Sequence, residues 1–363
     1  MAQSDKTITV IGAGNGGLAM AATASLLGAQ VAIYDVVEEL VAPIEKAAGV
    51  YLEDEHGKRF SPIRIATTDI KKALENTSLV LVVTPAFAHA SVAKSIAPHI
   101  SPGAYVVLNP GRTGGALEVA TILKQLCPEK EITVAEAQTL LYACRKTSPT
   151  EIVIKGKKSS VPLAAVPSHK TPLVLNELAA YFPAFTMAES VLETSFANIG
   201  AIFHPAPTLL NTGWIESSKG AFEYYHQGIS PAVADLLEQL DKERLRVANA
   251  YGVDIPSAKE WLKAAYGIDA PTLYDAIQKN PAYAGIKAPT SPDTRYLKED
   301  IPTGIVPISE LGRLAGVKTP LMDAIVCSAS FLLHADFRKT GRGISSMGAN
   351  GSTKEDFISM TRQ

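Results

Sequence analysis

The stretch that decides the fold lies at the start of the chain and reads Ile8-Thr9-Val10-Ile11-Gly12-Ala13-Gly14-Asn15-Gly16-Gly17-Leu18-Ala19. A short apolar run leads into the spacing G-x-G-x-x-G and then into an alanine-rich segment over residues 18–27, which predicts a buried strand, a glycine turn and a helix. Because the glycines stand in this strand–turn–helix context, the pattern indicates a dinucleotide-binding motif rather than an ordinary turn.

The glycines of this motif have different physical roles. Gly12 permits the tight turn out of the strand, Gly14 lets the backbone approach a pyrophosphate, and Gly17 allows the helix to pack closely on the sheet. Backbone amides at the start of the helix, including those of Asn15 and Gly16, are expected to bind the phosphate groups. All five residues are therefore predicted to bind the cofactor.

An acid follows the second apolar run, which covers residues 30–34 and ends in Asp35. Its distance from the first glycine matches the ~20 residues expected for an acid that binds the adenosine ribose. A carboxylate there accepts hydrogen bonds from the 2′-hydroxyl and repels a 2′-phosphate. No arginine stands in residues 36–39 to neutralise it. We therefore expect NAD(H) as the cofactor, with NADP(H) less favoured.

Length and composition are those of a globular protein with two domains. The 363 residues exceed the usual size of one core, and 47% of them are hydrophobic. A net charge of −2 argues against nucleic acid or an anionic membrane as a partner. Residues 1–7 do not resemble a leader, and no run has transmembrane character. The three cysteines have no metal-binding or disulfide spacing, so we expect a cytoplasmic protein with reduced thiols and no metal.

Strand and helix patterns alternate over the first half of the chain. Strands are expected at residues 78–83, 105–108 and 132–135, and helices at residues 40–48, 86–96 and 115–126. This alternation predicts an α/β fold with a doubly wound, Rossmann-type parallel sheet. A β-rich insertion is expected around the turn at residues 53–58. Extended segments over residues 151–166 are expected to add antiparallel strands to the sheet.

Helical patterns replace strands beyond about residue 191. Helices are expected at residues 230–251, 257–266 and 309–316, a buried helix at residues 324–337, and a loose glycine-rich segment at residues 341–351. We predict an NAD-binding Rossmann domain over residues 1–190 and an all-helical substrate domain over residues 191–363. Ligands of open α/β sheets bind at the carboxyl ends of the strands, so the active site is expected in a cleft between the domains.

Two polar segments of the helical half are candidates for the chemistry. His204 stands before Pro205, which should end or kink a helix just after the imidazole. A histidine suits proton transfer near neutral pH, but one before proline can also simply end a helix. The stretch from Arg295 through Tyr296 to Asp300 combines a cation, a phenol and an acid. It is equally explained as a solvated loop with a local ion pair.

Taken together, these motifs resemble the opine dehydrogenase family, which includes the octopine and nopaline dehydrogenases. The resemblance runs through nearly the whole chain. It is carried by residues 12–17, Asn109-Pro110-Gly111-Arg112-Thr113-Gly114-Gly115, His204-Pro205-Ala206-Pro207-Thr208-Leu209-Leu210-Asn211, Asn280-Pro281-Ala282-Tyr283, residues 295–300 and Pro307-Ile308-Ser309-Glu310-Leu311-Gly312-Arg313. It implies NADH-dependent condensation of an amino acid or related amine with a 2-oxo acid such as pyruvate, through an imine. It also implies a helical domain like the C-terminal domain of 6-phosphogluconate dehydrogenase.

The resemblance also implies roles for residues of the helical half. His204 matches the catalytic histidine, and Asp300 matches the acid that partners it. Arg295 matches an arginine near the substrate, and Tyr283 is expected on the same side of the pocket. Tyr296 is also expected to bind the substrate.

In the first half, the resemblance places Cys144 near the substrate and Thr84 and Pro85 beside the nicotinamide ribose. Taken alone, Cys144 is better explained as a small buried filler, and Pro85 also ends a strand.

Three positions depart from the family's pattern near the expected pocket. Where one member of the family has a small residue, an asparagine and a methionine, this chain has Arg112, Gly200 and Phe203. Arg112 could bind a carboxylate or be an exposed charge on a loop. These departures put the identity of the amine in doubt and leave the reaction class standing.

Two other functions remain open from the sequence. A 2-hydroxy acid or ketopantoate-like reductase also joins such a sheet to a helical domain, and would reduce an oxo acid without an amine. A non-catalytic NAD-sensing module would bind the cofactor alone. The apolar faces of the helical domain make a homodimer the expected assembly.

Overall fold

The computed structural model describes residues 6–362, which divide into two compact units. The first unit runs to Thr194 and includes the segment from Ser359 onward, and the second unit is Ser195–Ile358. The expectation about a leader concerns residues 1–7, of which residues 1–5 lie outside the described part. Across residues 6–362, no helix combines the length and the apolar character needed to cross a membrane.

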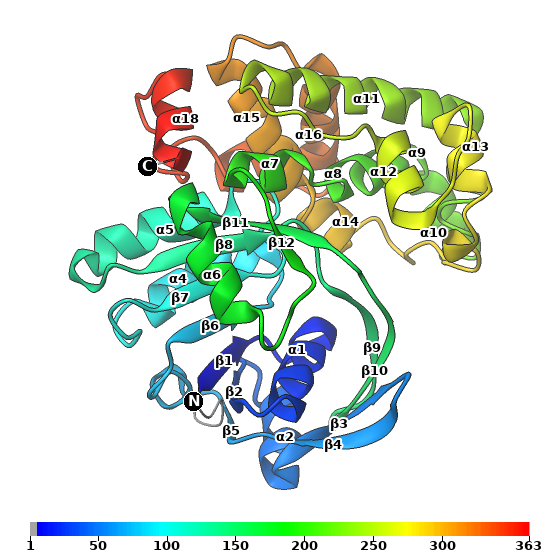
Figure 1. The fold of residues 1–363 in the computed structure, drawn as a ribbon. Helices are drawn as coiled ribbons and strands as arrows, with labels where there is room; N and C mark the ends of the chain where they lie inside the picture. Colours follow the sequence, from blue (N-terminus) through cyan, green and yellow to red (C-terminus); the bar gives the residue numbers. More distant parts are fainter. Residues whose placement is uncertain (1–5, 363) are drawn as a thin grey trace. The chain divides into compact units, whose positions relative to one another are not determined.

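The first unit is an α/β structure (Figure 1). Its strands are β1 Thr7–Ile11, β2 Gln30–Tyr34, β3 Gly49–Asp54, β4 Gly57–Pro62, β5 Ile65–Thr67, β6 Leu79–Val82, β7 Tyr105–Leu108, β8 Thr133–Ala137, β9 Tyr142–Ser148, β10 Glu151–Lys157, β11 Val161–Val166 and β12 Phe185–Met187. Its helical segments are α1 Asn15–Leu26, α2 Glu38–Ala47, α3 Ile70–Ala73, η1 Ala86–Ala88, α4 His89–Ile96, α5 Gly115–Leu126, η2 Pro128–Lys130, η3 Ser168–Lys170, α6 Thr171–Leu178 and α7 Val191–Phe196, which crosses into the second unit.

The main sheet has eight strands in the order β12-β11-β8-β7-β6-β1-β2-β5. Neighbouring strands from β5 to β8 pair in parallel, β11 runs antiparallel to β8, and β12 runs parallel to β11. The strand order reverses at β1, which is flanked by β2 and β6, and the glycine turn follows at the carboxyl end of β1. The predicted doubly wound sheet is confirmed.

A second sheet of four strands, in the order β4-β3-β10-β9, covers α1 from its other side. Helix α1 contacts β1 and β2 of the main sheet and all four strands of the second sheet, and Figure 1 shows it between them. Its sequence, NGGLAMAATASL, is apolar on every side, and its residues 18–22 are fully buried. A helix that is apolar all round is one that is buried all round.

One prediction about the sheets needs correction. Residues 151–166 were expected to add antiparallel strands to the main sheet, and only β11 does so. Strand β10 instead joins the second sheet, parallel to β3 and antiparallel to β9. The apolar alternation of a segment predicts a strand but does not specify which sheet edge it pairs with.

The second unit is helical (Figure 1). Its elements are α8 Gly200–Phe203, α9 Pro205–Leu210, α10 Thr212–Ser218, α11 Pro231–Ala250, α12 Ala258–Tyr266, α13 Leu273–Gln278, η4 Pro281–Tyr283, α14 Arg295–Lys298, the π-helical turn η5 Ile301–Ile305, α15 Val306–Leu314, α16 Pro320–Leu332, α17 Phe337–Thr340 and α18 Lys354–Arg362, which returns to the first unit.

Two predictions about the second unit were wrong in detail. The helix expected at residues 324–337 is α16, which ends at Leu332, and His334 then turns the chain with a positive φ of 49°. Phe331 on this helix is 78% exposed, so the helix is not buried throughout. The segment at residues 341–351 is not loose in its packing, because Arg342, Met347 and Ala349 are all buried.

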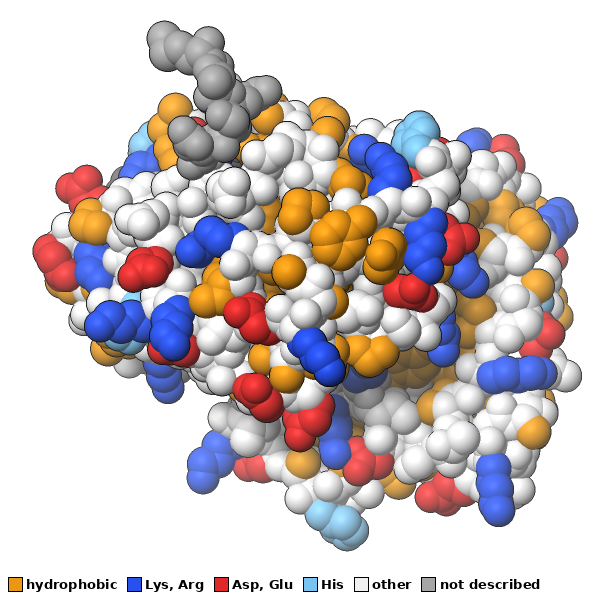
Figure 2. All heavy atoms as spheres, turned by 90° about the horizontal axis from the view of Figure 1, so that it is seen from below, with side chains coloured by type: hydrophobic (Ala, Val, Ile, Leu, Met, Phe, Trp, Pro, Cys, Tyr) orange, Lys and Arg blue, Asp and Glu red, His pale blue; other side chains and the backbone are white. Residues whose placement is uncertain are grey.

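Surface charge is mixed in sign. On the face drawn in Figure 2, lysine and arginine side chains alternate with aspartate and glutamate. This pattern agrees with the small net charge of −2.

The contact between α1 and the glycine turn is too close for side chains. A Cβ on Gly17 would lie 1.7 Å from the carbonyl oxygen of Gly12. Gly12 itself has a φ of +108°, and a Cβ there would lie 2.8 Å from the carbonyl oxygen of Val83. Both positions therefore require glycine, as the motif predicts.

We expect Gly17→Ala to lower the free energy of unfolding by about 2 kcal/mol or more, because the methyl group must displace backbone rather than a flexible side chain. Gly14→Ala is the matched control: its φ is −78° and a Cβ there meets nothing within 4 Å. Its unfolding free energy should stay within about 0.5 kcal/mol of the wild type. Urea titration followed by circular dichroism measures both, and equal stability of the two variants would contradict the packing role of Gly17.

Candidate active site

The centre of the helical unit is a histidine paired with an acid. His204 lies between α8 and α9, and Pro205 begins α9 directly after the imidazole, as the sequence predicted. Nδ1 of His204 lies 2.7 Å from Oδ2 of Asp300. The side chain of Asp300 is 2% exposed and that of His204 is 21% exposed. Because Nδ1 is engaged, Nε2 is the ring nitrogen left for proton transfer.

The acid reaches the histidine through an unusual turn. Asp300 directly precedes η5, whose i to i+5 hydrogen bond runs from the amide of Ile305 to the carbonyl of Asp300 (3.0 Å). Such π turns within helices often mark functional sites. A Cβ on Gly304 in this turn would lie 3.0 Å from the Cβ of Ala201 on α8. A larger residue at position 304 would therefore press against α8.

Tyr296 stacks on the imidazole of His204. The ring centroids are 4.4 Å apart and the planes differ by 17°. Burial raises the pKa of the Tyr296 phenol, and the charge of Asp300 adds to this effect. The phenol therefore stays neutral, and its ring stacks on the imidazole. The sequence placed Tyr296 with the substrate, whereas its contact in this unit is with the histidine itself.

Two hydroxyl groups hold the backbone at His204, and sequence reasoning did not identify either of them. Thr208 Oγ1 and Tyr224 Oη each donate to the carbonyl oxygen of His204 over 2.7 Å, and they lie 2.8 Å from each other. Burial raises the pKa of Tyr224 well above its usual value, so it remains a neutral donor. Thr208 lies within the quoted His204 motif, but nothing in the sequence around Tyr224 indicates this role.

Two other predicted substrate residues of this unit, Tyr283 and Arg295, have partners of their own. Tyr283 stacks on Tyr225 at 4.0 Å between ring centroids, and Tyr225 in turn packs edge-on against Tyr224 at 5.0 Å. Arg295 pairs with Glu299 one helical turn later, over 2.8 Å, and its side chain is 67% exposed.

The two departures from the family pattern in this unit lie on α8. Gly200 is its first residue and is buried. Phe203 is 2% exposed and packs with its ring centroid 6.1 Å from that of Trp261.

The predicted cofactor residues gather at the glycine turn of the first unit. Asp35 accepts hydrogen bonds from the amides of Ala13 (2.7 Å) and Val37 (3.1 Å), so this carboxylate also holds the turn in shape. The space beyond Gly14 is open, and the first turn of α1 has no side-chain cap and no acidic residue. The exposed amides and the open space suit the pyrophosphate of a dinucleotide.

Thr84 and Pro85 follow β6, the strand on the other side of β1. The hydroxyl oxygen of Thr84 is buried and forms no hydrogen bond within the described residues. Such an orphaned polar atom at the carboxyl end of a strand suits a polar ligand group. Pro85 is exposed and directly precedes η1.

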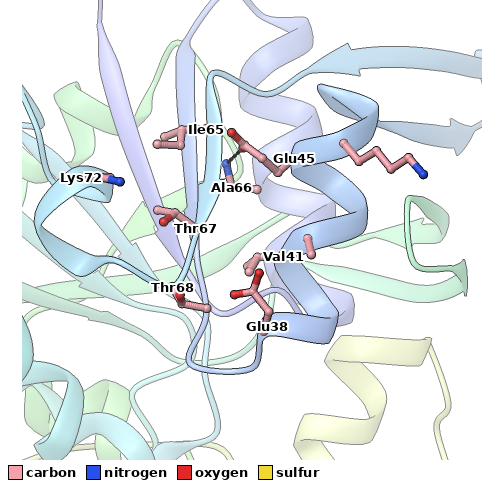
Figure 3. Close-up of a pocket in the computed structure, with 10 residues that line it drawn as sticks. Glu38, Val41, Glu45, Ile65, Ala66, Thr67, Thr68 and Lys72 are labelled. Atoms are coloured by element: carbon pink, nitrogen blue, oxygen red, sulfur yellow. Dashed lines mark hydrogen bonds between the residues drawn. The ribbon is translucent and has the colours of Figure 1, made fainter.

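Figure 3 shows a depression of about 460 Å³ between α2 and β5. Its lining includes Glu38, Thr67 and Thr68, and Glu45 accepts a hydrogen bond from the amide of Ala66 over 2.6 Å. It adjoins the Asp35 turn, because the Asp35 amide donates to the carbonyl of Thr67 (3.4 Å). None of the predicted site residues lines it.

The remaining predicted residues also lie in the first unit. Arg112, in the loop between β7 and α5, has a left-handed φ of 60°, and such conformations concentrate at functional sites. Cys144 on β9 packs against the hydrophobic core. Burial raises the pKa of its thiol to about 11, so at neutral pH it is a neutral side chain.

Comparison with known proteins agrees with both halves of this description. Residues 7–161 match the family model of the NAD-dependent glycerol-3-phosphate dehydrogenase N-terminus, and residues 187–333 match that of the NAD/NADP octopine/nopaline dehydrogenase alpha-helical domain. The chain is 40% identical to the opine dehydrogenase of Arthrobacter sp. (strain 1C) over 96% of both chains. It is 28% identical to the octopine dehydrogenase of Pecten maximus over 92% of both.

Solved structures give the same fold. Octopine dehydrogenase with NADH and L-arginine superposes with a TM-score of 0.81 at 24% identity, covering 97% of this chain and 98% of that one. A dinucleotide-binding sheet joined to this type of helical unit defines a class of nicotinamide-dependent oxidoreductases. Within that class, the chain belongs to the opine dehydrogenase family.

The environment of Cys144 predicts low reactivity toward alkylating agents, because the thiolate is the nucleophile and burial disfavours it. At pH 8 we expect iodoacetamide to label the exposed Cys327 at least about tenfold faster than Cys144. The rate at Cys144 should still rise with each pH step up to about 9.5, below its pKa of about 11. Peptide mass spectrometry over time measures both rates, and equal labelling at pH 8 would contradict the raised pKa.

Proposed function

We propose that this enzyme catalyses the NADH-dependent reductive condensation of an amino acid, or a related amine, with a 2-oxo acid such as pyruvate. The observation that carries the proposal is the 2.7 Å contact between His204 Nδ1 and Asp300 Oδ2, with Nε2 left for proton transfer. Structures of a relative support the proposal. Octopine dehydrogenase has been solved in complex with NADH and L-arginine, and in a second structure with NADH and pyruvate.

In the proposed reaction, the amine nitrogen forms a bond to the carbonyl carbon of the oxo acid, and the carbonyl oxygen leaves as water. The resulting imine accepts a hydride at the former carbonyl carbon. NADH supplies this hydride and leaves as NAD⁺. Starting from the ammonium form of the amino acid, the reaction takes up one proton and gives a secondary ammonium ion with two carboxylates.

His204 would move the protons that these steps require. Neutral Nε2 removes a proton from the substrate ammonium, which frees the lone pair for attack on the carbonyl carbon. The imidazolium then donates a proton to the hydroxyl group of the addition compound as water leaves. The Asp300 carboxylate accepts a hydrogen bond from Nδ1–H throughout, so it fixes the tautomer and stabilises the imidazolium.

The proposed product has two carboxylates, and we expect a cation of the protein to bind each of them. We propose Arg295 for one and Arg112 for the other, since a guanidinium forks onto a carboxylate with two parallel hydrogen bonds. The left-handed φ of Arg112 supports its role. Tyr283, Cys144, Gly200, Phe203 and Tyr296 are proposed to shape the space for the amine.

NAD(H) is the proposed cofactor, with NADP(H) less favoured. Asp35 places a carboxylate beside the glycine turn, where it would repel a 2′-phosphate. We propose that residues 1–190 bind this cofactor and that residues 191–363 bind the substrates. We further propose a homodimer in the cytoplasm, where the three free cysteines would stay reduced. Light scattering during size-exclusion chromatography tests the subunit count.

The direct test follows NADH absorbance with pyruvate alone and with pyruvate plus each member of an amino acid panel. The proposal expects oxidation of NADH only when an amine and an oxo acid are both present, and a product whose mass equals amine plus oxo acid minus one oxygen.

A second candidate is a reductase that acts on the oxo acid alone. A ketopantoate reductase of Ralstonia eutropha superposes with a TM-score of 0.61 at 18% identity. Oxidation of NADH with an oxo acid and no amine, giving the hydroxy acid, would favour this candidate and refute the condensation.

Replacing His204 by Ala should lower kcat by at least about a hundredfold, the usual contribution of a general acid or base, while NADH affinity changes little. His226→Ala is a matched control, because His226 also pairs with an acid in the same unit, with Nδ1 3.2 Å from Glu223 Oε2. Its kcat should stay within about twofold of the wild type. Near-normal turnover in the His204 variant would remove this residue from the mechanism.

A further inference from the structure

Strand β9 of the second sheet is tied to the glycine turn by one residue, Lys146. Its backbone amide donates to Oδ1 of Asn15 over 2.9 Å. Its Nζ donates to the carbonyl oxygen of Ala13 over 3.2 Å. The lysine therefore lies against the residues between β1 and the start of α1, where the sequence predicts the phosphate groups of the cofactor.

The charge of Lys146 is not neutralised by an ion pair. Within residues 6–362, no carboxylate lies within 4.0 Å of its Nζ. Burial lowers the pKa of Lys146, and the charge of nearby Asp35 partly offsets that effect. The contact with Ala13 uses one of the three N–H donors of the ammonium group. Two donors and a full positive charge remain for a ligand.

The groups around the Lys146 ammonium favour the binding of an anion. Helix α1 begins with uncapped amides and no acidic side chain in its first turn, and the partial positive charge of a helix N-terminus attracts phosphate. A lysine beside that terminus adds a whole charge to the same region. Oδ1 of Asn15 accepts the hydrogen bond that holds β9, so its backbone amide and its Nδ2 donors remain to bind the cofactor.

We propose that Lys146 is a cofactor-binding residue whose ammonium group binds the pyrophosphate of the dinucleotide. This inference rests on the proposed NAD(H) cofactor. It adds to the motif in the first strand–turn–helix a cation supplied by a strand more than a hundred residues away in the sequence. It also gives the second sheet a part in cofactor binding.

The test compares three variants by quenching of protein fluorescence on titration with NADH, without substrates, so that turnover plays no part. Lys146→Met keeps the length of the side chain and removes the charge, and we expect its Kd for NADH to rise about tenfold. Lys146→Arg should stay within about threefold of the wild type. Lys155→Met is the matched control on the same sheet, because Lys155 on β10 is exposed, and its Kd should not change.

Competition experiments against bound NADH show which part of the ligand the Lys146 ammonium binds. With Lys146→Met, displacement by ADP should weaken about tenfold, and displacement by adenosine, which has no phosphate, should be unchanged. A variant that binds NADH and ADP as tightly as the wild type would overturn the inference, even if its thermal stability is lower. If Lys146→Met weakened the binding of NADPH alone, the ammonium would be assigned to the 2′-phosphate of the adenosine ribose. That result would overturn the assignment to the pyrophosphate. A wild-type protein that binds no NADH would refute the proposed cofactor itself.

Discussion

The first unit depends on one contact, the approach of α1 to the carbonyl of Gly12. The position of a Gly17 Cβ lies 1.7 Å from that oxygen, so helix and turn touch backbone to backbone. This closeness lets the small side chains of α1 pack against two sheets at once. The same closeness leaves the first amides of α1 uncovered at the end of β1. The packing of α1 and its proposed binding of phosphate therefore have a common geometric origin.

The second unit is organised around a buried cation rather than a glycine. Arg244 on α11 is 1% exposed and donates to the carbonyls of Phe196 and Pro256, both over 2.8 Å, and to Asp241. Asp241 also accepts from the amide of Ala258 at the start of α12. A buried pair of this kind is costly to break, because the remaining charge would lose its partner. It fixes the end of α7, eight residues before His204.

The local sequence pattern predicts most helices and strands, but it does not show which residues come together in the site. The strand at residues 105–108 and the helix at residues 115–126 have the predicted bounds, because each has a strong apolar period and a glycine or turn beside it. Strand β10 has an equally clear pattern, yet its partner β3 lies about a hundred residues earlier, and no local rule selects that edge. His204 and Asp300 are 96 residues apart. Only the family resemblance could join them before the structure did.

The pairing of β3 with β10 has a consequence for biosynthesis. The second sheet needs residues 49–54 and residues 151–157 together, and β9 holds the glycine turn through Asn15. During translation the motif at residues 12–17 is made first, but its covering sheet is complete only after β10 has left the ribosome. Contacts so distant in sequence form late, since a long loop must close before they are gained. The glycine motif is thus made well before the strands that complete its final surroundings.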